Sequence, residues 1–286
     1  AYCSVACTTD YCIHGDFSEN ATITGTRSTA TSSHALLIAN SNNATIENVT
    51  ATGADAAWTI GIYRSNSTII TRTTAVSSTT SALHVNMSNH TTITNSTLTS
   101  TDGQGLFIDG SSYTHAANIT AIASGVGNAL FVGGGINTTI INSTATSNTN
   151  ASTFVQFGNS TRFLNFTSIS SNSHALTLQF DLYTWISNTT SYSNSSNAFH
   201  AQASFLAEIH NSTLTSNSSY GAYISAGSGN TTFINTTITS NYSNAVSIDS
   251  SENATFENST IYSTASYAVN SSGSDFTVLK HCTIFS

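Results

Sequence analysis

The chain has 286 residues, of which only 6% are charged, and its formal net charge is −8. Its 5 lysine and arginine residues are scattered and form no basic patch, which argues against binding to nucleic acid or to an anionic membrane surface. No apolar stretch approaches the ~20 residues of a membrane-spanning helix. Because the polarity comes from uncharged side chains, charge repulsion does not favour disorder.

The first predicted element is a cysteine-bearing segment, residues 1–17. It holds Cys3, Cys7 and Cys12, and the fourth cysteine of the chain is Cys282. An even number of cysteines in a chain rich in Asn-x-Ser/Thr triplets suits an oxidising, extracellular setting. The spacing matches no standard zinc motif, and no metal or other cofactor is predicted. We expect one disulfide inside residues 3–12.

The second predicted element, residues 18–286, repeats every 23–24 residues. A fixed period in this range is typical of a solenoid. We number each copy from one apolar residue, taken as position 0. These residues are Ile23, Ile46, Ile69, Ile93, Ala116, Ile140, Phe163, Ile186, Ile209, Phe233, Phe256 and Leu279.

The pattern inside one copy predicts three short strands. Position +5 is again small or apolar, as at Ala51 and Leu98, so it cannot lie on the same face of one unbroken strand as position 0. An Asn at +2, such as Asn48, supplies the corner, since Asn tolerates the left-handed conformation. A third alternating stretch follows, for example "ALLI" at 35–38. The sequence therefore predicts an all-β fold, a right-handed parallel β-solenoid of about twelve coils.

The repeated phrases resemble a known group of proteins. "TIENVT" at 45–50 and "TFENST" at 255–260 are similar to the right-handed parallel β-helix repeats of the pectate-lyase-like and NosD-like superfamily. The resemblance covers about residues 18–284 and implies the fold, which hosts enzymes, adhesins and structural proteins alike. The composition, without proline and with dense Asn-x-Thr, also resembles archaeal or microbial surface-layer, sheath and fibre glycoproteins.

Two phased rows of Asn-x-Thr triplets are candidate glycosylation sites. Each row has an alternative, purely structural interpretation, in which Asn forms a corner and Thr begins a strand. The row near position −3 is the better acceptor, because it lies in a connecting loop. This row is Asn20, Asn43, Asn66, Asn89, Asn137, Asn159, Asn230 and Asn253; the +2 row is Asn48, Asn95, Asn118, Asn142, Asn165, Asn188, Asn211, Asn235 and Asn258.

Catalytic chemistry is not evident in the repeat. Solenoid enzymes that act on polysaccharides place carboxylates at equal phase on adjacent coils. Here only Glu252 and Asp275 meet that condition, and a weak calcium site or solvated acids are the two interpretations of the pair. Rows of Thr-x-Thr, such as "TLT" at 97–99, resemble the ice-binding face of some β-solenoids, but Tyr192 and Tyr262 interrupt them.

We therefore expect a secreted, glycosylated structural protein at the cell surface, without enzymatic activity. Its expected partner is itself, in a head-to-tail polymer that forms a fibre, sheath or layer. A disulfide from Cys3 or Cys7 to Cys282 of the next subunit would link the polymer, and a free, buried Cys282 is the alternative. The alternative functions are a monomeric binding module (an adhesin or an ice binder) and, third, a polysaccharide-acting enzyme.

Overall fold

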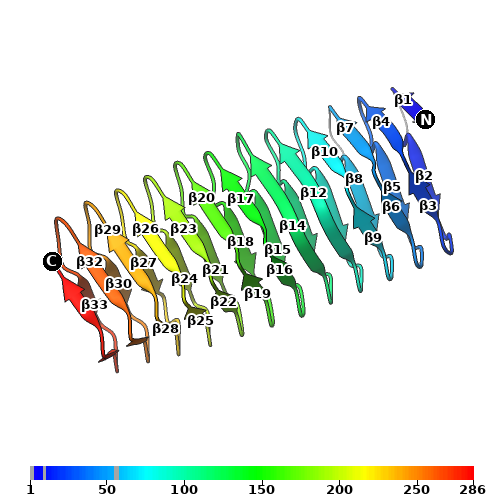
Figure 1. Ribbon diagram of the computed structural model, residues 1–286. Coiled ribbons are helices and arrows are strands. Elements are labelled where there is room, and N and C mark those ends of the chain that lie inside the picture. Colours follow the sequence, from blue (N-terminus) through cyan, green and yellow to red (C-terminus); the bar gives the residue numbers. More distant parts are fainter. Residues whose placement is uncertain (1–2, 9–10, 55–57) are drawn as a thin grey trace. The chain divides into compact units, whose positions relative to one another are not determined.

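The computed structural model describes residues 3–8, 11–54 and 58–286, and it folds them into short parallel strands joined by tight corners (Figure 1). The chain divides into two compact units, residues 1–146 (unit 1) and residues 147–286 (unit 2). Within each unit, the first two strands of a coil lie in one sheet (sheet A) and the third lies in another (sheet B); in two coils of unit 1 the first two are continuous as one long strand, β12 or β14. None of the described residues forms a helix that could cross a membrane.

The strands of unit 1 are as follows. Sheet A contains β1 (Cys3–Cys7), β3 (Thr22–Thr24), β4 (Thr26–Ala30), β6 (Thr45–Glu47), β7 (Thr50–Gly53), β9 (Ile69–Thr71), β10 (Thr74–Ser77), β12 (Thr92–Ser100), β14 (His115–Ala123), β16 (Thr139–Ile141) and β17 (Thr144–Ser147). Sheet B contains β2 (Ile13–Asp16), β5 (Leu36–Ala39), β8 (Ile60–Tyr63), β11 (Leu83–Asn86), β13 (Leu106–Asp109) and β15 (Leu130–Gly133).

Unit 2 repeats the same plan. Sheet A contains β19 (Arg162–Leu164), β20 (Thr167–Ser170), β22 (Trp185–Ser187), β23 (Thr190–Ser193), β25 (Glu208–His210), β26 (Thr213–Ser216), β28 (Thr232–Ile234), β29 (Thr237–Ser240), β31 (Thr255–Glu257), β32 (Thr260–Ser263), β34 (Val278–Lys280) and β35 (Thr283–Phe285). Sheet B contains β18 (Thr153–Gln156), β21 (Leu176–Gln179), β24 (Phe199–Gln202), β27 (Ala222–Ser225), β30 (Val246–Asp249) and β33 (Val269–Ser272). The predicted all-β parallel solenoid is confirmed.

The Asn corner between the first two strands of a coil adopts the predicted left-handed conformation. The backbone φ is 53° at Asn48, 51° at Asn188 and 49° at Asn258. The turn at each of these residues lets the residues at 0 and +5 both point inward, although an odd number of positions separates them. The amides also form a ladder on the surface, where Asn118 Nδ2 donates to Asn95 Oδ1 over 3.0 Å.

The interior is a set of aliphatic and aromatic stacks, one residue per coil. Ile46, Ile70 and Ile93 are in register and fully buried, and burial of such a side chain stabilises the fold by about 1.5–3 kcal/mol. The assignment of Ile69 to this stack is wrong, because Ile69 is 47% exposed. A slip of one residue reverses the face of a strand. In this coil Arg72, at φ 51°, occupies the corner in place of Asn, so the sequence lacks the residue that would identify position 0.

Buried serines form a second ladder at the corner that precedes each coil's first strand. The N–H of Ser41 donates to Ser65 Oγ over 3.2 Å, and the N–H of Ser65 donates to Ser88 Oγ over 3.1 Å. Each hydroxyl thus satisfies a backbone donor that the tight corner would otherwise bury without a partner. A small hydroxyl side chain is therefore the ordinary residue of this position.

The cysteine-bearing segment continues the two sheets of unit 1. Strand β1 pairs with β4, and β2 pairs with β5, both in parallel. A disulfide joins Cys7 to Cys12. Cys282 is half-buried and forms no disulfide with any cysteine whose side chain is described. The side chain of Cys3 lies outside the described part of the chain, so the intermolecular link to Cys282 stays a prediction.

Candidate functional site

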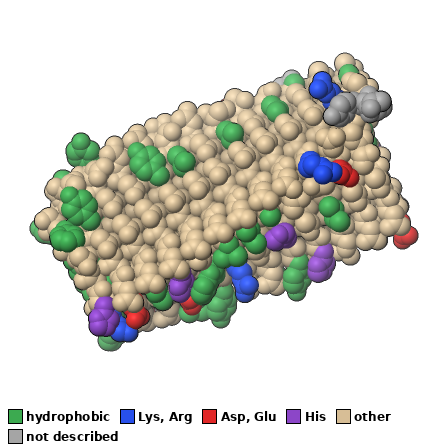
Figure 2. All heavy atoms as spheres, viewed as in Figure 1, with side chains coloured by type: hydrophobic (Ala, Val, Ile, Leu, Met, Phe, Trp, Pro, Cys, Tyr) green, Lys and Arg blue, Asp and Glu red, His purple; other side chains and the backbone are tan. Residues whose placement is uncertain are grey.

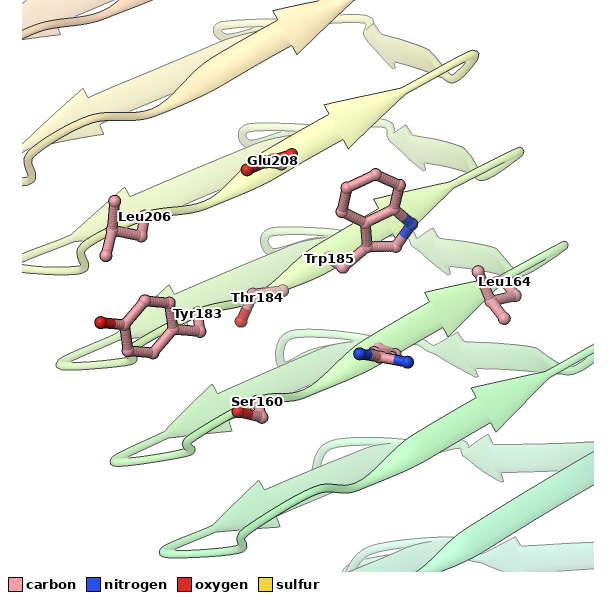
Figure 3. Close-up of a pocket in the computed structure, with 8 residues that line it drawn as sticks. Ser160, Leu164, Tyr183, Thr184, Trp185, Leu206 and Glu208 are labelled. Carbon is pink, nitrogen blue, oxygen red and sulfur yellow. The ribbon is translucent and has the colours of Figure 1, made fainter.

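A pocket of about 570 Å³ opens on the outer face of sheet A in unit 2. Strands β19, β22 and β25 of three consecutive coils, with the corners that precede them, form its floor and walls (Figure 3). A volume of this size suits a small molecule or one or two sugar units. Its lining residues are Ser160, Arg162, Leu164, Tyr183, Thr184, Trp185, Leu206 and Glu208.

The two charged groups of the pocket and its tryptophan come from one row of the repeat. Arg162, Trp185 and Glu208 are in direct register as the first residues of β19, β22 and β25. In the next two coils the same row is occupied by Thr232 and Thr255. Three consecutive coils thus replace a small polar residue with a cation, a large aromatic ring and a carboxylate.

A stacked histidine extends this row into a linked group. The ring of His210 lies 4.2 Å from the ring of Trp185 at an interplanar angle of 20°. His210 Nε2 is 3.1 Å from Glu208 Oε2, within hydrogen-bonding distance. A carboxylate that accepts from one imidazole nitrogen leaves the other nitrogen with a lone pair in the neutral ring. The group can therefore accept a proton beside an aromatic surface.

The corner that forms one wall of the pocket carries large side chains in left-handed conformations. Tyr183 has φ 62° and Leu206 has φ 57°, whereas the next coil uses Asn230 at φ 53°. Bulky residues rarely adopt this conformation, although other corners of this chain, such as those at Tyr113 and Phe157, also carry them. Tyr183 is 53% exposed, and Leu206 on the next coil also lines the pocket. Together they give the pocket an apolar rim.

The pocket combines groups that are scarce on this protein. The face shown in Figure 2 is covered mostly by side chains that are neither hydrophobic nor charged, as the 6% charge of the whole chain implies. An exposed tryptophan beside an arginine and a glutamate is therefore a local departure from the repeat. The indole of such a set can pack against the apolar face of a sugar ring, and the guanidinium can bind a carboxylate.

The predicted site residues lie elsewhere, on the corners of both units. Every Asn of the +2 row is exposed, and the −3 row is exposed except at Asn159, which is half-buried. The side chains are therefore accessible to a glycosylating enzyme, and occupancy stays a prediction. Glu252 and Asp275 pair in an isolated bridge between neighbouring coils, as expected from their phase. Among the described residues no group of three His, Cys, Asp or Glu side chains could hold a metal ion.

The search for catalytic residues from sequence missed this site. It looked for carboxylates on adjacent coils, whereas Arg162 and Glu208 share one phase but lie two coils apart, with Trp185 between them. The signal was present in the sequence as three consecutive exceptions to Thr, the residue most common in this row.

Comparisons with known proteins agree on the fold. A family model described as "Right handed beta helix region" matches residues 81–238 and 225–286. The A-module of mannuronan C-5 epimerase AlgE6 from Azotobacter vinelandii is similar over 93% of this chain and 88% of that chain, with 10% identity and a TM-score of 0.65. The tailspike protein gp49 from Pseudomonas phage LKA1 is similar over 86% of this chain and 48% of that chain, with 10% identity and a TM-score of 0.62.

A variant of the periplasmic alginate epimerase AlgG is similar over 93% of this chain and 77% of that chain, with 11% identity and a TM-score of 0.58. No curated protein matches the sequence. At these identities the likeness shows the fold alone. The prediction of a structural protein without enzymatic activity is nevertheless wrong against these findings, since two of the three similar structures are polysaccharide epimerases. They favour the third alternative, a polysaccharide-acting enzyme.

Proposed function

The chain belongs to the family of right-handed β-helix proteins, and from that premise we propose that unit 2 binds an acidic polysaccharide and acts on it at C-5 of a uronate ring. The observation that carries the proposal is the row Arg162, Trp185 and Glu208, with His210 stacked on the tryptophan. The names of the similar epimerases, which act on mannuronan and alginate, support the choice of substrate class.

Arg162 and Trp185 are the binding groups in this proposal. The guanidinium forms two parallel hydrogen bonds to the uronate carboxylate, and its charge stabilises the negative charge that develops when the neighbouring C-5 proton leaves. The indole packs against the apolar face of the sugar ring. Since Arg162 and Glu208 lie on either side of Trp185 in the row, the carboxylate of the sugar is directed toward the β19 side.

Glu208 and Tyr183 are the proton-transfer groups. The Glu208 carboxylate, which lines the pocket and is held by His210 Nε2, takes the C-5 proton. The Tyr183 hydroxyl, on the corner wall of the pocket, returns a proton. If the proton returns to C-5 from the side opposite to its removal, the configuration of that carbon is inverted. Return to the O-4 leaving group instead, with the C-4 to C-5 double bond forming as the C-4 to O-4 bond breaks, is the elimination reaction of a lyase.

The test is incubation of the protein with polymannuronate and polygalacturonate in deuterated water. We expect deuterium at C-5 by NMR, or an unsaturated product by ultraviolet absorbance. Arg162→Ala and Glu208→Gln abolish the turnover in this account, and Thr255→Ala, in the same row outside the pocket, leaves it intact. A wild-type protein that exchanges no C-5 proton and forms no unsaturated product with either polymer contradicts the proposal.

We also propose an extracellular setting with glycans on the exposed −3 row. The support is the exposure of Asn43, Asn66, Asn230 and Asn253, together with the disulfide between Cys7 and Cys12. These corners lie at the opposite end of the first strand from the +2 ladder. Sugar on them leaves the aromatic floor of the pocket open, because the corners of the pocket itself carry Ser160, Tyr183 and Leu206 at the corresponding left-handed positions.

A further inference from the structure

A serine and a histidine meet on the outer face of sheet B in unit 2, in different rows from those that form the pocket. His200 lies in β24 and Ser225 ends β27, the paired strand of the next coil. His200 Nε2 is 3.1 Å from Ser225 Oγ, within hydrogen-bonding distance. A hydroxyl and an imidazole in this relation are the groups that form an activated serine nucleophile.

The fold does not require a histidine beside a serine of this row. In register, Asp249 follows Ser225 and Ser272 follows Asp249. Beside Ser272, the place that His200 has in the earlier coil is occupied by Ser247. The pair is therefore a local departure from the repeat, and Ser272 provides a matched serine without a histidine.

The histidine is in the state that a base needs. Burial, with the charge of the neighbouring His174, lowers the pKa of His200 to about 4, so the ring is neutral at neutral pH. The ring of Tyr223 stacks on it at 5.0 Å and an interplanar angle of 17°, which limits its rotation. His200 Nδ1 is buried and has no hydrogen-bond partner among the described residues. When Nδ1 carries the ring proton, the Nε2 lone pair faces the hydroxyl of Ser225.

The chain turns sharply directly after the serine. Ala226 has φ 57° and Gly227 has φ 77°, and the N–H of Ser228 donates to the carbonyl of Ser225 over 3.2 Å, as in a type I′ turn. In the preceding coil the matching N–H, that of Ala203, donates to the carbonyl of Ser225 over 3.2 Å. The N–H of Ala226 donates to no described residue. A backbone donor next to the serine is therefore available to a ligand.

The site is open to solvent at this turn. Ser225 is 7% exposed, but Ala226 and Gly227 are exposed, and a Cβ at Gly227 would meet no atom within 4 Å. The half-buried rings of Tyr220 and Tyr223 lie 5.2 Å apart beside the pair. Aromatic rings next to a nucleophile are a surface on which the apolar face of a sugar can pack.

We propose that Ser225 and His200 hydrolyse an O-acyl ester of a carbohydrate. Ser225 Oγ attacks the acyl carbon while its proton passes to His200 Nε2, and the N–H of Ala226 stabilises the negative carbonyl oxygen. The bond from the acyl carbon to the sugar oxygen then breaks, and that oxygen takes the proton from Nε2. Water, deprotonated by His200, attacks the acyl-serine, and the carboxylic acid leaves as Ser225 regains its proton.

The test uses the full chain with a fluorophosphonate, which reacts with activated serines, and with p-nitrophenyl acetate and a methyl mannoside 6-acetate. We expect the probe on the peptide that contains Ser225, by mass spectrometry, and release of acetate from both esters. Ser225→Ala and His200→Gln should each lower ester hydrolysis by about a hundredfold, the effect of losing the nucleophile or its base. Ser272→Ala should leave labelling and hydrolysis unchanged.

A double variant separates a catalytic pair from a hydrogen bond that only stabilises the fold. Groups that act as a unit are not additive, so Ser225→Ala combined with His200→Gln should be no slower than Ser225→Ala alone. Urea unfolding checks the fold of each variant, and His200→Tyr, which keeps a ring against Tyr223, replaces His200→Gln if that variant unfolds. An unlabelled wild type, a label on another residue, or equal hydrolysis by wild type and Ser225→Ala overturns the inference. Neither ester contains a uronate, so these results are independent of the proposed function.

Discussion

Asp181 should make the stability of the protein fall as the pH rises through the neutral range. Its pKa is raised from 3.8 to about 7 by burial, so the folded chain keeps the proton up to about pH 7 while the unfolded chain loses it near pH 4. The free energy of unfolding therefore decreases between these two values and is level above them. The slope is about 1.4 kcal/mol per pH unit, and pH 5 lies roughly two units below the midpoint. The free energy of unfolding should therefore fall by about 3 kcal/mol between pH 5 and pH 8.

The assay is urea unfolding at pH 5 and pH 8 for the wild type, Asp181→Asn and Asp181→Ser. Neither replacement titrates, so each variant should lose about 3 kcal/mol less than the wild type over this interval. Subtracting the variant's change from that of the wild type cancels the other titrating groups, including the buried histidines. If the variants and the wild type show the same change between pH 5 and pH 8, the carboxyl group is not a buried acid with a raised pKa.

Four further predictions concern other parts of the molecule. Burial, with the charge of a neighbouring histidine, lowers the pKa of His84 to about 4, so stability should fall by up to about 3 kcal/mol as the pH drops from 6.5 to 4, and His84→Phe should remove this loss in acid unfolding curves. Gly103→Ala should lower the free energy of unfolding by about 3 kcal/mol, because its Cβ would lie 2.3 Å from a backbone carbonyl carbon, whereas Gly227→Ala, with open space around it but φ +77°, should lose only about 1 kcal/mol in urea. Trp185→Ala should weaken binding of a mannuronate tetramer roughly tenfold, and Trp185→Phe should retain most of the affinity by calorimetry. Protein from its native source should exceed the bare mass of 29.9 kDa by whole glycans that map to peptides such as the one with Asn43, and an intact mass at the bare value contradicts this.

The fold could be predicted from sequence because one physical requirement is repeated in every coil. A buried residue at position 0, an Asn corner at +2 and a second buried residue at +5 fix the path of the chain, and the spacing of 23–24 residues fixes the stacking. In one coil where the Asn is missing, the prediction slips by one residue. With Arg72 at the corner, the choice between Ile69 and Ile70 had no local guide, and it was resolved by the register with Ile46 and Ile93.

The candidate site could not be predicted in the same way, because a site is a departure from the repeat. Arg162, Trp185 and Glu208 are far apart in sequence and meet only when the coils are stacked in correct register. The contact between Trp185 and His210 depends on rotamers, which no spacing reveals. Asp181 could have been noticed as an acid in a serine position, but the space for its carboxyl group depends on Gly158 in the preceding coil, and that pairing appears only in three dimensions.

The most direct test of the account is a crystal structure of the protein soaked with a mannuronate tetramer. The account predicts electron density for a sugar ring against the indole of Trp185, with its carboxylate on the guanidinium of Arg162 and its C-5 facing the carboxylate of Glu208. Density for the tetramer on another face, or an empty pocket at saturating tetramer while the protein still turns over polymannuronate, would contradict the assignment of the site.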